Sequence, residues 1–194
     1  MNLMNYNKLI IKQEKEMMEV FTGFETKNRY QILNNNALVG FAGEQSDSMG
    51  RFLMPANRPL KLSVLNSQKN NILTLDRKFF FFLPKYQIYG SDNQLIGTIK
   101  TKFSFAKKKI EIIDSQNHLL YTAHTEITHP WTMRVFQGQR EIARVTKKWS
   151  GMGREMFTDA DTIEVRFGTT PNEQIRKLIL ALGFALDLTF FEKH

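Results

Sequence analysis

Short hydrophobic segments separated by polar turns fill the chain from about residue 9 to residue 167. Residues 60–65 (LKLSVL) and 109–113 (KIEII) alternate between apolar and polar positions, which is the period of a half-buried strand. Turn-forming clusters of Asn, Asp, Ser, Gly and Gln separate such segments at residues 34–36, 66–70, 90–93, 114–117 and 137–139. The pattern predicts an antiparallel meander of roughly twelve strands, a number that favours a closed barrel over an open sheet.

The residues after 171 have a different, helical pattern, with apolar side chains on nearly every face. Asn172 is suited to cap the N-terminus of a helix, and the acidic Glu173 would lie in its first turn. We therefore expect one C-terminal helix that continues from Ile175 to Phe191.

This helix has to be enclosed, because a helix that is apolar all round is stable only inside protein or lipid. Its longest apolar run, residues 178–191, has 14 residues and contains Asp187, so it is shorter than the ~20 residues that span a bilayer. Three small residues would keep its middle narrow enough for a barrel lumen: Ala181, Gly183 and Ala185. We expect Asp187 to be a buried carboxyl that accepts hydrogen bonds near one mouth of the barrel.

The 194 residues are enough for one well-cored domain, and we expect a single domain over residues 1–194. The net charge of +8 favours a polyanionic partner, either an anionic membrane or a nucleic acid. No RNA-binding or helix-turn-helix pattern accompanies this charge, so a nucleic acid is not expected. The absence of cysteine excludes disulfides, thiolate metal sites and a cysteine nucleophile.

The first 20 residues carry Lys and Glu side chains instead of the apolar core of a signal peptide. We therefore expect a cytoplasmic protein that is peripherally or loosely associated with a membrane and is not secreted. Its oligomeric state is left open.

Residues 78–85 (KFFFFLPK) are the most unusual segment of the chain. Phe79, Phe80, Phe81 and Phe82 would place two rings on each face of a strand, so that one pair lies outside the core. One interpretation is a membrane contact in which the rings enter the lipid interface while Lys78 and Lys85 meet anionic headgroups. The alternative is a strand that is buried on both faces or covered at its edge by a partner.

A second basic segment contains Lys107, Lys108 and Lys109, close to Phe103 and Phe105. Such a cluster suits an anionic bilayer or phosphoinositide headgroups. The alternative is an ordinary solvated face, which is what most runs of charge are.

The last third of the chain resembles the phospholipid scramblase family, which is related to the plant LURP-one proteins and to the Tubby C-terminal domain. The resemblance lies in residues 147–151 (KKWSG), residues 157–161 (FTDAD) and the ending Phe190, Phe191 and Glu192. It extends, more weakly, over nearly the whole chain, beginning at residues 19–28 (EVFTGFETKN). The resemblance implies a Tubby-like barrel of twelve strands around the C-terminal helix, and the movement of phospholipids between bilayer leaflets, with calcium as a cofactor.

The family's calcium site aligns with residues 159–170. Asp159 and Asp161 are suitable oxygen ligands for calcium, and Glu164 could add a third carboxylate. Thr170 stands where the family closes the site with an aspartate. In the alternative interpretation, Asp159 and Asp161 belong to a turn and accept backbone hydrogen bonds, while Glu164 lies on the polar face of a strand.

Two functions are therefore open: phospholipid transport, and docking on anionic lipid or phosphoinositide without transport. A single enclosed helix supplies no polar path across ~30 Å of hydrocarbon, so transport would need oligomers or local thinning of the bilayer. An enzyme is not expected, because His118, His124 and His129 come without any motif for metal binding, nucleophilic attack or phosphate binding.

Overall fold

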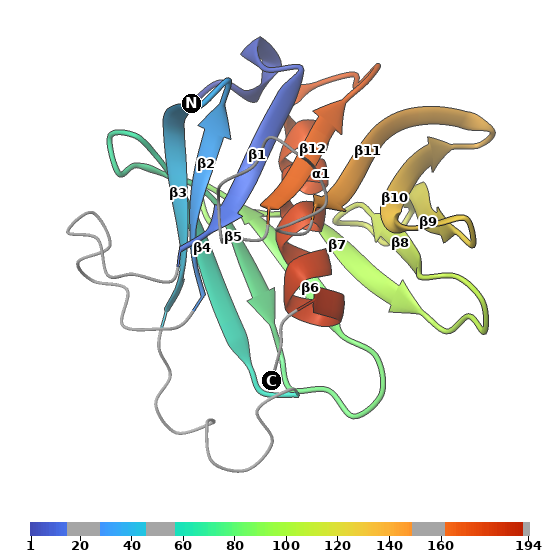
Figure 1. The fold of residues 1–194 in the computed structure, drawn as a ribbon. Coiled ribbons are helices and arrows are strands. Elements are labelled where there is room, and N and C mark those ends of the chain that lie inside the picture. The colour runs from blue at the N-terminus through green and yellow to red at the C-terminus, as the bar shows by residue number, and fades with distance from the viewer. Residues whose placement is uncertain (15–27, 46–56, 149–161, 192–194) are drawn as a thin grey trace.

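The computed structural model describes residues 1–14, 28–45, 57–148 and 162–191. The strands in these residues form a closed antiparallel barrel (Figure 1). They are β1 (Lys8–Gln13), β2 (Arg29–Asn34), β3 (Ala37–Gln45), β4 (Leu60–Asn66), β5 (Asn71–Arg77), β6 (Lys85–Gly90), β7 (Leu95–Lys102), β8 (Lys109–Ile113), β9 (Leu119–Glu126), β10 (His129–Gln137), β11 (Arg140–Lys148) and β12 (Thr162–Phe167). Each strand pairs with its sequence neighbours, and β1 closes the barrel by pairing with both β2 and β12. The predicted twelve-stranded barrel is confirmed.

The alternation in the sequence determines which side chains enter the barrel. In β4, Leu60, Leu62 and Val64 are buried while Lys61 is exposed. In β8, Ile110 and Ile112 are buried in the same way. Because successive side chains of a strand point to opposite faces, this register places one face of each strand against the contents of the lumen.

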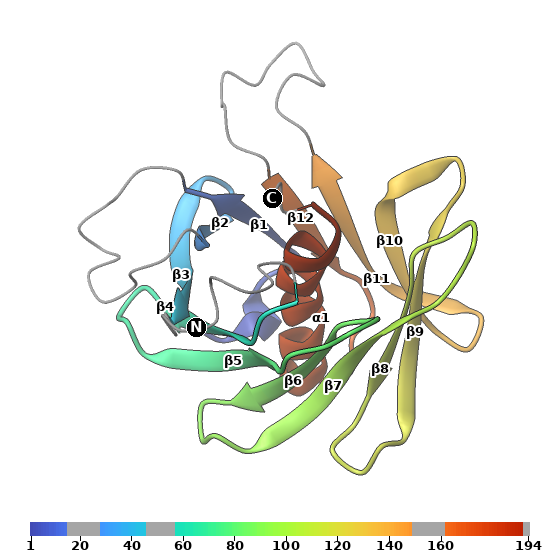
Figure 2. The same ribbon diagram turned by 90° about the horizontal axis from the view of Figure 1, so that it is seen from below.

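The lumen is filled by helix α1 (Glu173–Leu186), which the strands surround (Figures 1 and 2). Asn172 caps it as predicted, since its side chain accepts a hydrogen bond from the Ile175 amide at 3.0 Å. The helix continues as a π-helical turn, η4 (Asp187–Phe191). The C-terminal helix expected to extend to Phe191 is therefore confirmed, with a change to π-helical geometry in its last turn.

Close packing against the strands explains the small residues of α1. A Cβ atom added at Gly183 would lie 2.8 Å from Ile11 Cδ1 and 3.1 Å from Val165 Cγ2. The side chains of β1 and β12 thus occupy the space that any larger residue at this position would need. On the other side of the lumen, a Cβ at Gly97 in β7 would lie 3.0 Å from Leu178.

Arg176 connects the first turns of α1 to the N-terminal segment. Its buried guanidinium donates to the Leu3 carbonyl at 2.8 Å and to Thr170 Oγ1 at 2.7 Å. Leu3 itself is fully buried in the short helix η1 (Leu3–Asn5). This cluster covers the end of the barrel at which α1 begins.

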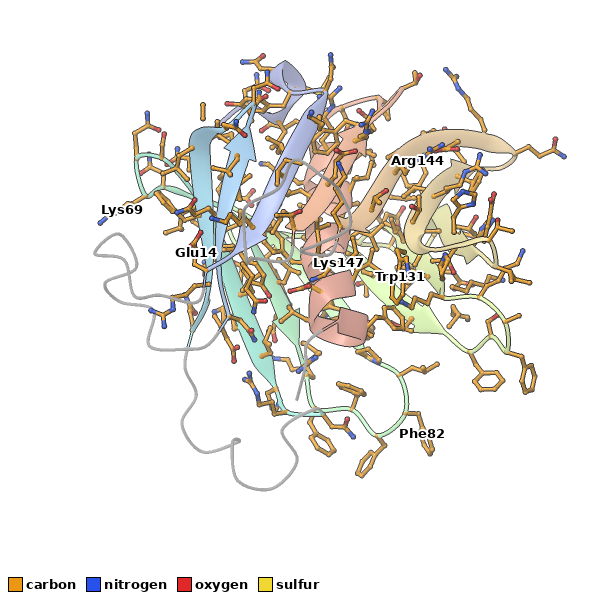
Figure 3. All side chains as sticks on the ribbon, viewed as in Figure 1. Glu14, Lys69, Phe82, Trp131, Arg144 and Lys147 are labelled. Atoms are coloured by element: carbon orange, nitrogen blue, oxygen red, sulfur yellow. The ribbon has the colours of Figure 1, made fainter. Side chains whose placement is uncertain are left out.

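Asp187 is the buried carboxyl at the other end of the helix. Lys147 Nζ donates to its Oδ1 at 2.7 Å, and the Tyr30 hydroxyl donates to its Oδ2 at 3.0 Å. The side chains of Lys147 and Asp187 are only 2% and 4% exposed. The expected carboxyl with side-chain donors is confirmed, and Lys147, which belongs to a basic motif in the sequence, lies beside the helix inside the barrel (Figure 3).

This buried pair leads to a prediction about stability. Asp187→Ala would leave the Lys147 ammonium buried without its carboxylate, and we expect it to lower the free energy of unfolding by about 3–5 kcal/mol in urea titrations. The double change Lys147→Met with Asp187→Leu removes both charges and should recover at least half of that loss. An Asp187→Ala protein within about 1 kcal/mol of the parent would show that the pair is not a major source of stability.

Candidate functional site

The two ends of the barrel have different connections. In an antiparallel meander every second connection lies at the same end. At one end, tight turns join the strands, and several of their residues have positive φ: Asn35, Asn36, Lys69, Asn93, Asn117 and Gly138. Asn and Gly adopt this left-handed conformation more readily than other residues, which explains the Asn-rich clusters in the sequence.

The opposite end, which we call the loop end, carries two longer connections and one short one among the described residues. Residues 78–84 join β5 to β6 and residues 103–108 join β7 to β8, while residues 127–128 join β9 to β10. The helix also finishes at this end, because Phe190 lies against Lys108 of the β7–β8 connection. The topology thus brings the Phe-rich and Lys-rich segments of the sequence to one end of the molecule.

The Phe-rich segment is a loop and not a strand, so the predicted pair of rings on each strand face is wrong. Strand β5 ends at Arg77 and β6 begins at Lys85, which leaves Phe79, Phe81 and Phe82 exposed. Phe82 is 92% exposed and points away from the barrel in Figure 3. Three of the four rings therefore lie outside the core, and the alternative of a strand buried on both faces is excluded.

Arg77, at the base of this loop, contacts both the loop and the interior of the barrel. Its guanidinium is 5.3 Å from the Phe80 ring, and the side chain of Arg77 is only 2% exposed. Arg77 donates to the Tyr86 hydroxyl at 3.2 Å, which lies 2.9 Å from Thr189 Oγ1 in η4. Arg77 was not singled out in the sequence, because nothing in the run DRKFFFF shows that its arginine points inward.

The β7–β8 connection presents a second pair of rings. Phe103 and Phe105 are 71% and 97% exposed, and their rings pack edge to face with centroids 4.9 Å apart. Lys107 and Lys109 beside them are exposed as well. The loop end therefore combines exposed aromatic rings with exposed cations from two separate connections.

Lys108 has a different environment from its two neighbours. Its ammonium lies 5.1 Å from the centre of the Trp131 ring and 5.0 Å from that of Phe190. Partial burial against these rings lowers the pKa of Lys108. Of the three consecutive lysines predicted in this segment, Lys107 and Lys109 are exposed, whereas Lys108 is partly buried against the two rings.

The predicted calcium ligands divide into two groups. Asp159 and Asp161 lie outside the described residues. Glu164 accepts hydrogen bonds from Lys148 at 2.8 Å and from Arg166, and although its burial opposes ionisation, these cations lower its pKa. Thr170 Oγ1 accepts a hydrogen bond from Arg176, near the end of the barrel at which α1 begins. Glu164 and Thr170 therefore contact different cationic side chains.

Within the described part of the chain, no group of three or more His, Asp or Glu side chains could hold a metal ion. The three histidines of the described residues are separated: His118 contacts Asp114 in the β8–β9 turn at 3.1 Å, whereas His129 begins β10 at the loop end. His124 stacks on Phe136 with ring centroids 4.8 Å apart. Residues 1–14, 28–45, 57–148 and 162–191 contain no helix that is long and apolar enough to cross a membrane.

Comparison with known proteins identifies the family to which this barrel belongs. The family model described as "Scramblase" matches residues 1–193. Phospholipid scramblase 1 of Mus musculus is 26% identical over 98% of this chain and 63% of its own length. Phospholipid scramblase 2 of Bos taurus is 23% identical over 98% of this chain and 70% of its own length.

A yeast protein is equally similar: altered inheritance rate of mitochondria protein 25 of Saccharomyces cerevisiae is 25% identical over 99% of this chain and 72% of its own length. The chain spans 63% of the length of the mouse relative. No solved structure matches it. Because the family model covers nearly every residue, this chain belongs to the scramblase family.

Proposed function

We propose that this protein docks on anionic phospholipid membranes through the loop end of its barrel. The observation that carries the proposal is the exposure of Phe81, Phe82, Phe103 and Phe105 at one end, together with exposed lysines. Large exposed apolar groups at one place mark an interaction surface, and aromatic rings beside cations suit the boundary between headgroups and acyl chains.

The energies of such docking are modest for each residue and add up over the end of the barrel. A Lys or Arg near an anionic surface contributes about 1 kcal/mol, and a fully buried Phe about 1.5–3 kcal/mol. Two pairs of rings and several lysines thus suffice for reversible peripheral binding. This mode of binding needs no membrane-spanning helix.

Phospholipid movement between leaflets is the second candidate function. It is supported by family membership and by the names of the mouse and bovine relatives, phospholipid scramblases 1 and 2. In this barrel α1 fills the lumen, so the proposed path for lipid does not pass through the barrel. Transport would instead follow from docking, through local thinning of the bilayer by inserted rings or through assembly of several copies.

Docking is tested by flotation with vesicles of phosphatidylcholine alone or with phosphatidylserine. We expect binding to the mixed vesicles, weakened about tenfold or more by Phe82→Ser with Phe105→Ser, because two rings no longer enter the interface. Leu119→Ser is the matched control, since Leu119 is an exposed apolar residue beside the β8–β9 turn, at the other end of the barrel. Equal binding of the double variant and the control would contradict the proposal.

The calcium dependence that the family resemblance implies is tested by calorimetry on the full chain. We expect weak binding, with a dissociation constant of about 0.1–1 mM, and its loss in Asp159→Asn. Asp92→Asn in the β6–β7 turn is a control with the same change of side chain. Absence of heat at about 10 mM calcium, tenfold above that range, would remove calcium from the proposal.

The same preparations decide whether docking leads to transport. In vesicles with a fluorescent lipid in both leaflets, dithionite bleaches about half of the signal unless lipid exchanges between leaflets. If the protein moves phospholipids, the bleached fraction rises in vesicles that bind the parent protein and not in those with Phe82→Ser and Phe105→Ser. Tight binding without added bleaching would leave docking as the function.

A further inference from the structure

A cavity of about 360 Å³ lies under the β7–β8 connection at the loop end. The connection itself forms one wall, and Leu83, Thr125, Pro130 and Phe190 complete the lining. The cavity thus joins the Phe-rich loop, the β9–β10 hairpin and the last turn of the helix. Its volume is in the range of sites that bind a small molecule or a headgroup (about 300–1,000 Å³).

The charged side chains that line the cavity are, among the described residues, all cationic. They are Lys102, Lys107, Lys108 and Lys109. Lys102 forms an ion pair with Glu111 at 3.4 Å, but Glu111 is not part of the lining. The complementary ligand is therefore an anion.

Lys108 gives this cavity a cation of defined position. Its ammonium is held against the rings of Trp131 and Phe190, and its backbone amide donates to Thr125 Oγ1 at 3.1 Å. The hydroxyls of Thr101 and Thr125 belong to the same lining and are suited to hydrogen-bond a phosphate oxygen. A positioned cation with neutral hydrogen-bonding groups distinguishes this cavity from the mobile lysines of a solvated surface.

The rim of the cavity is apolar on the side of the exposed loops. Phe103 and Phe105 belong to the lining and are also the rings that the loop end presents to its surroundings. An anion that reaches Lys108 from a membrane would pass beside this pair of rings. The arrangement suits a ligand with a charged head and an apolar remainder, which is the chemistry of a phospholipid.

We propose that this cavity binds the phosphate-bearing headgroup of one anionic phospholipid, with Lys108 as the fixed cation at its base and Phe103 and Phe105 beside the acyl chains. The proposal rests on membrane docking by the loop end and adds to it a site for a single lipid molecule. The phosphate comes from the bilayer and not from a soluble metabolite, because the apolar rim would contribute nothing to a free anion.

The test uses dihexanoyl phosphatidylserine below its micellar concentration, so that no membrane is present. Trp131 reports on the site through its contact with Lys108, in a Trp149→Phe background that leaves one tryptophan in the chain. We expect a saturable change of fluorescence, weakened about tenfold or more in Lys108→Gln, because a charge-assisted contact to the phosphate is lost. Lys69→Gln, in the β4–β5 turn at the opposite end, should bind like the background.

A second variant distinguishes a loss of lipid binding from a loss of folding. Lys107→Gln with Lys109→Gln changes two exposed lysines of the lining and should also weaken lipid binding, with an unchanged melting temperature. Absence of saturable binding, or equal binding by Lys108→Gln and Lys69→Gln, would overturn the proposal even where flotation shows docking. Inorganic phosphate that binds as tightly as the lipid, and depends equally on Lys108, would overturn the assignment to a lipid.

Discussion

The structure depends on the enclosure of one helix. Helix α1 is buried at every residue from Leu178 to Leu186, so it is stable only where protein surrounds this part. A closed barrel does this without leaving an open sheet edge, and β6, β7, β11 and β12 lie directly against the helix. At Gly183 the side chains of Ile11 and Val165 leave no room for a larger residue in the helix.

Enclosure also places the last turn of the helix at the centre of the loop end. Within η4, Asp187 holds Lys147 of β11, Thr189 contacts Tyr86 of β6, and Phe190 packs on Lys108. One π-helical turn is therefore connected to three separate parts of the barrel rim, including the bases of both aromatic loops. Single π-helical turns often occur at functional sites, where they redirect side chains that a regular helix would place elsewhere.

The fold could be predicted from the sequence because its determinants are local. The Asn-rich clusters mark the turns, alternation marks the strands and Asn172 marks the start of the helix. The candidate site was less predictable, because its side chains act through contacts that are distant in sequence. In the sequence, Lys147 and Lys108 both belong to basic clusters. In the structure, Lys147 is paired with Asp187 inside the barrel. Lys108 lies against the rings of Trp131 and Phe190.

The Phe-rich loop shows a different limit. Four consecutive Phe residues have high strand propensity, and alternation alone would place them in a ladder with Lys85 and its successors. The register of β5 with β6 instead starts at the pair Arg77 and Tyr86 and leaves residues 78–84 outside the ladder. The strand pairing decides which residues form the ladder of a hairpin and which form its loop. This pairing cannot be predicted from the sequence of one strand alone.

The pairing of β1 with β12 has a consequence for synthesis of the chain. Strand β1 leaves the ribosome first, yet one of its edges finds its partner only when residues 162–167 have been made, and α1 follows later still. Until the helix has been made, the apolar faces of all twelve described strands lack the element that they are to surround. The nascent chain therefore exposes apolar surface until its last elements have been made, and such surface is what molecular chaperones bind.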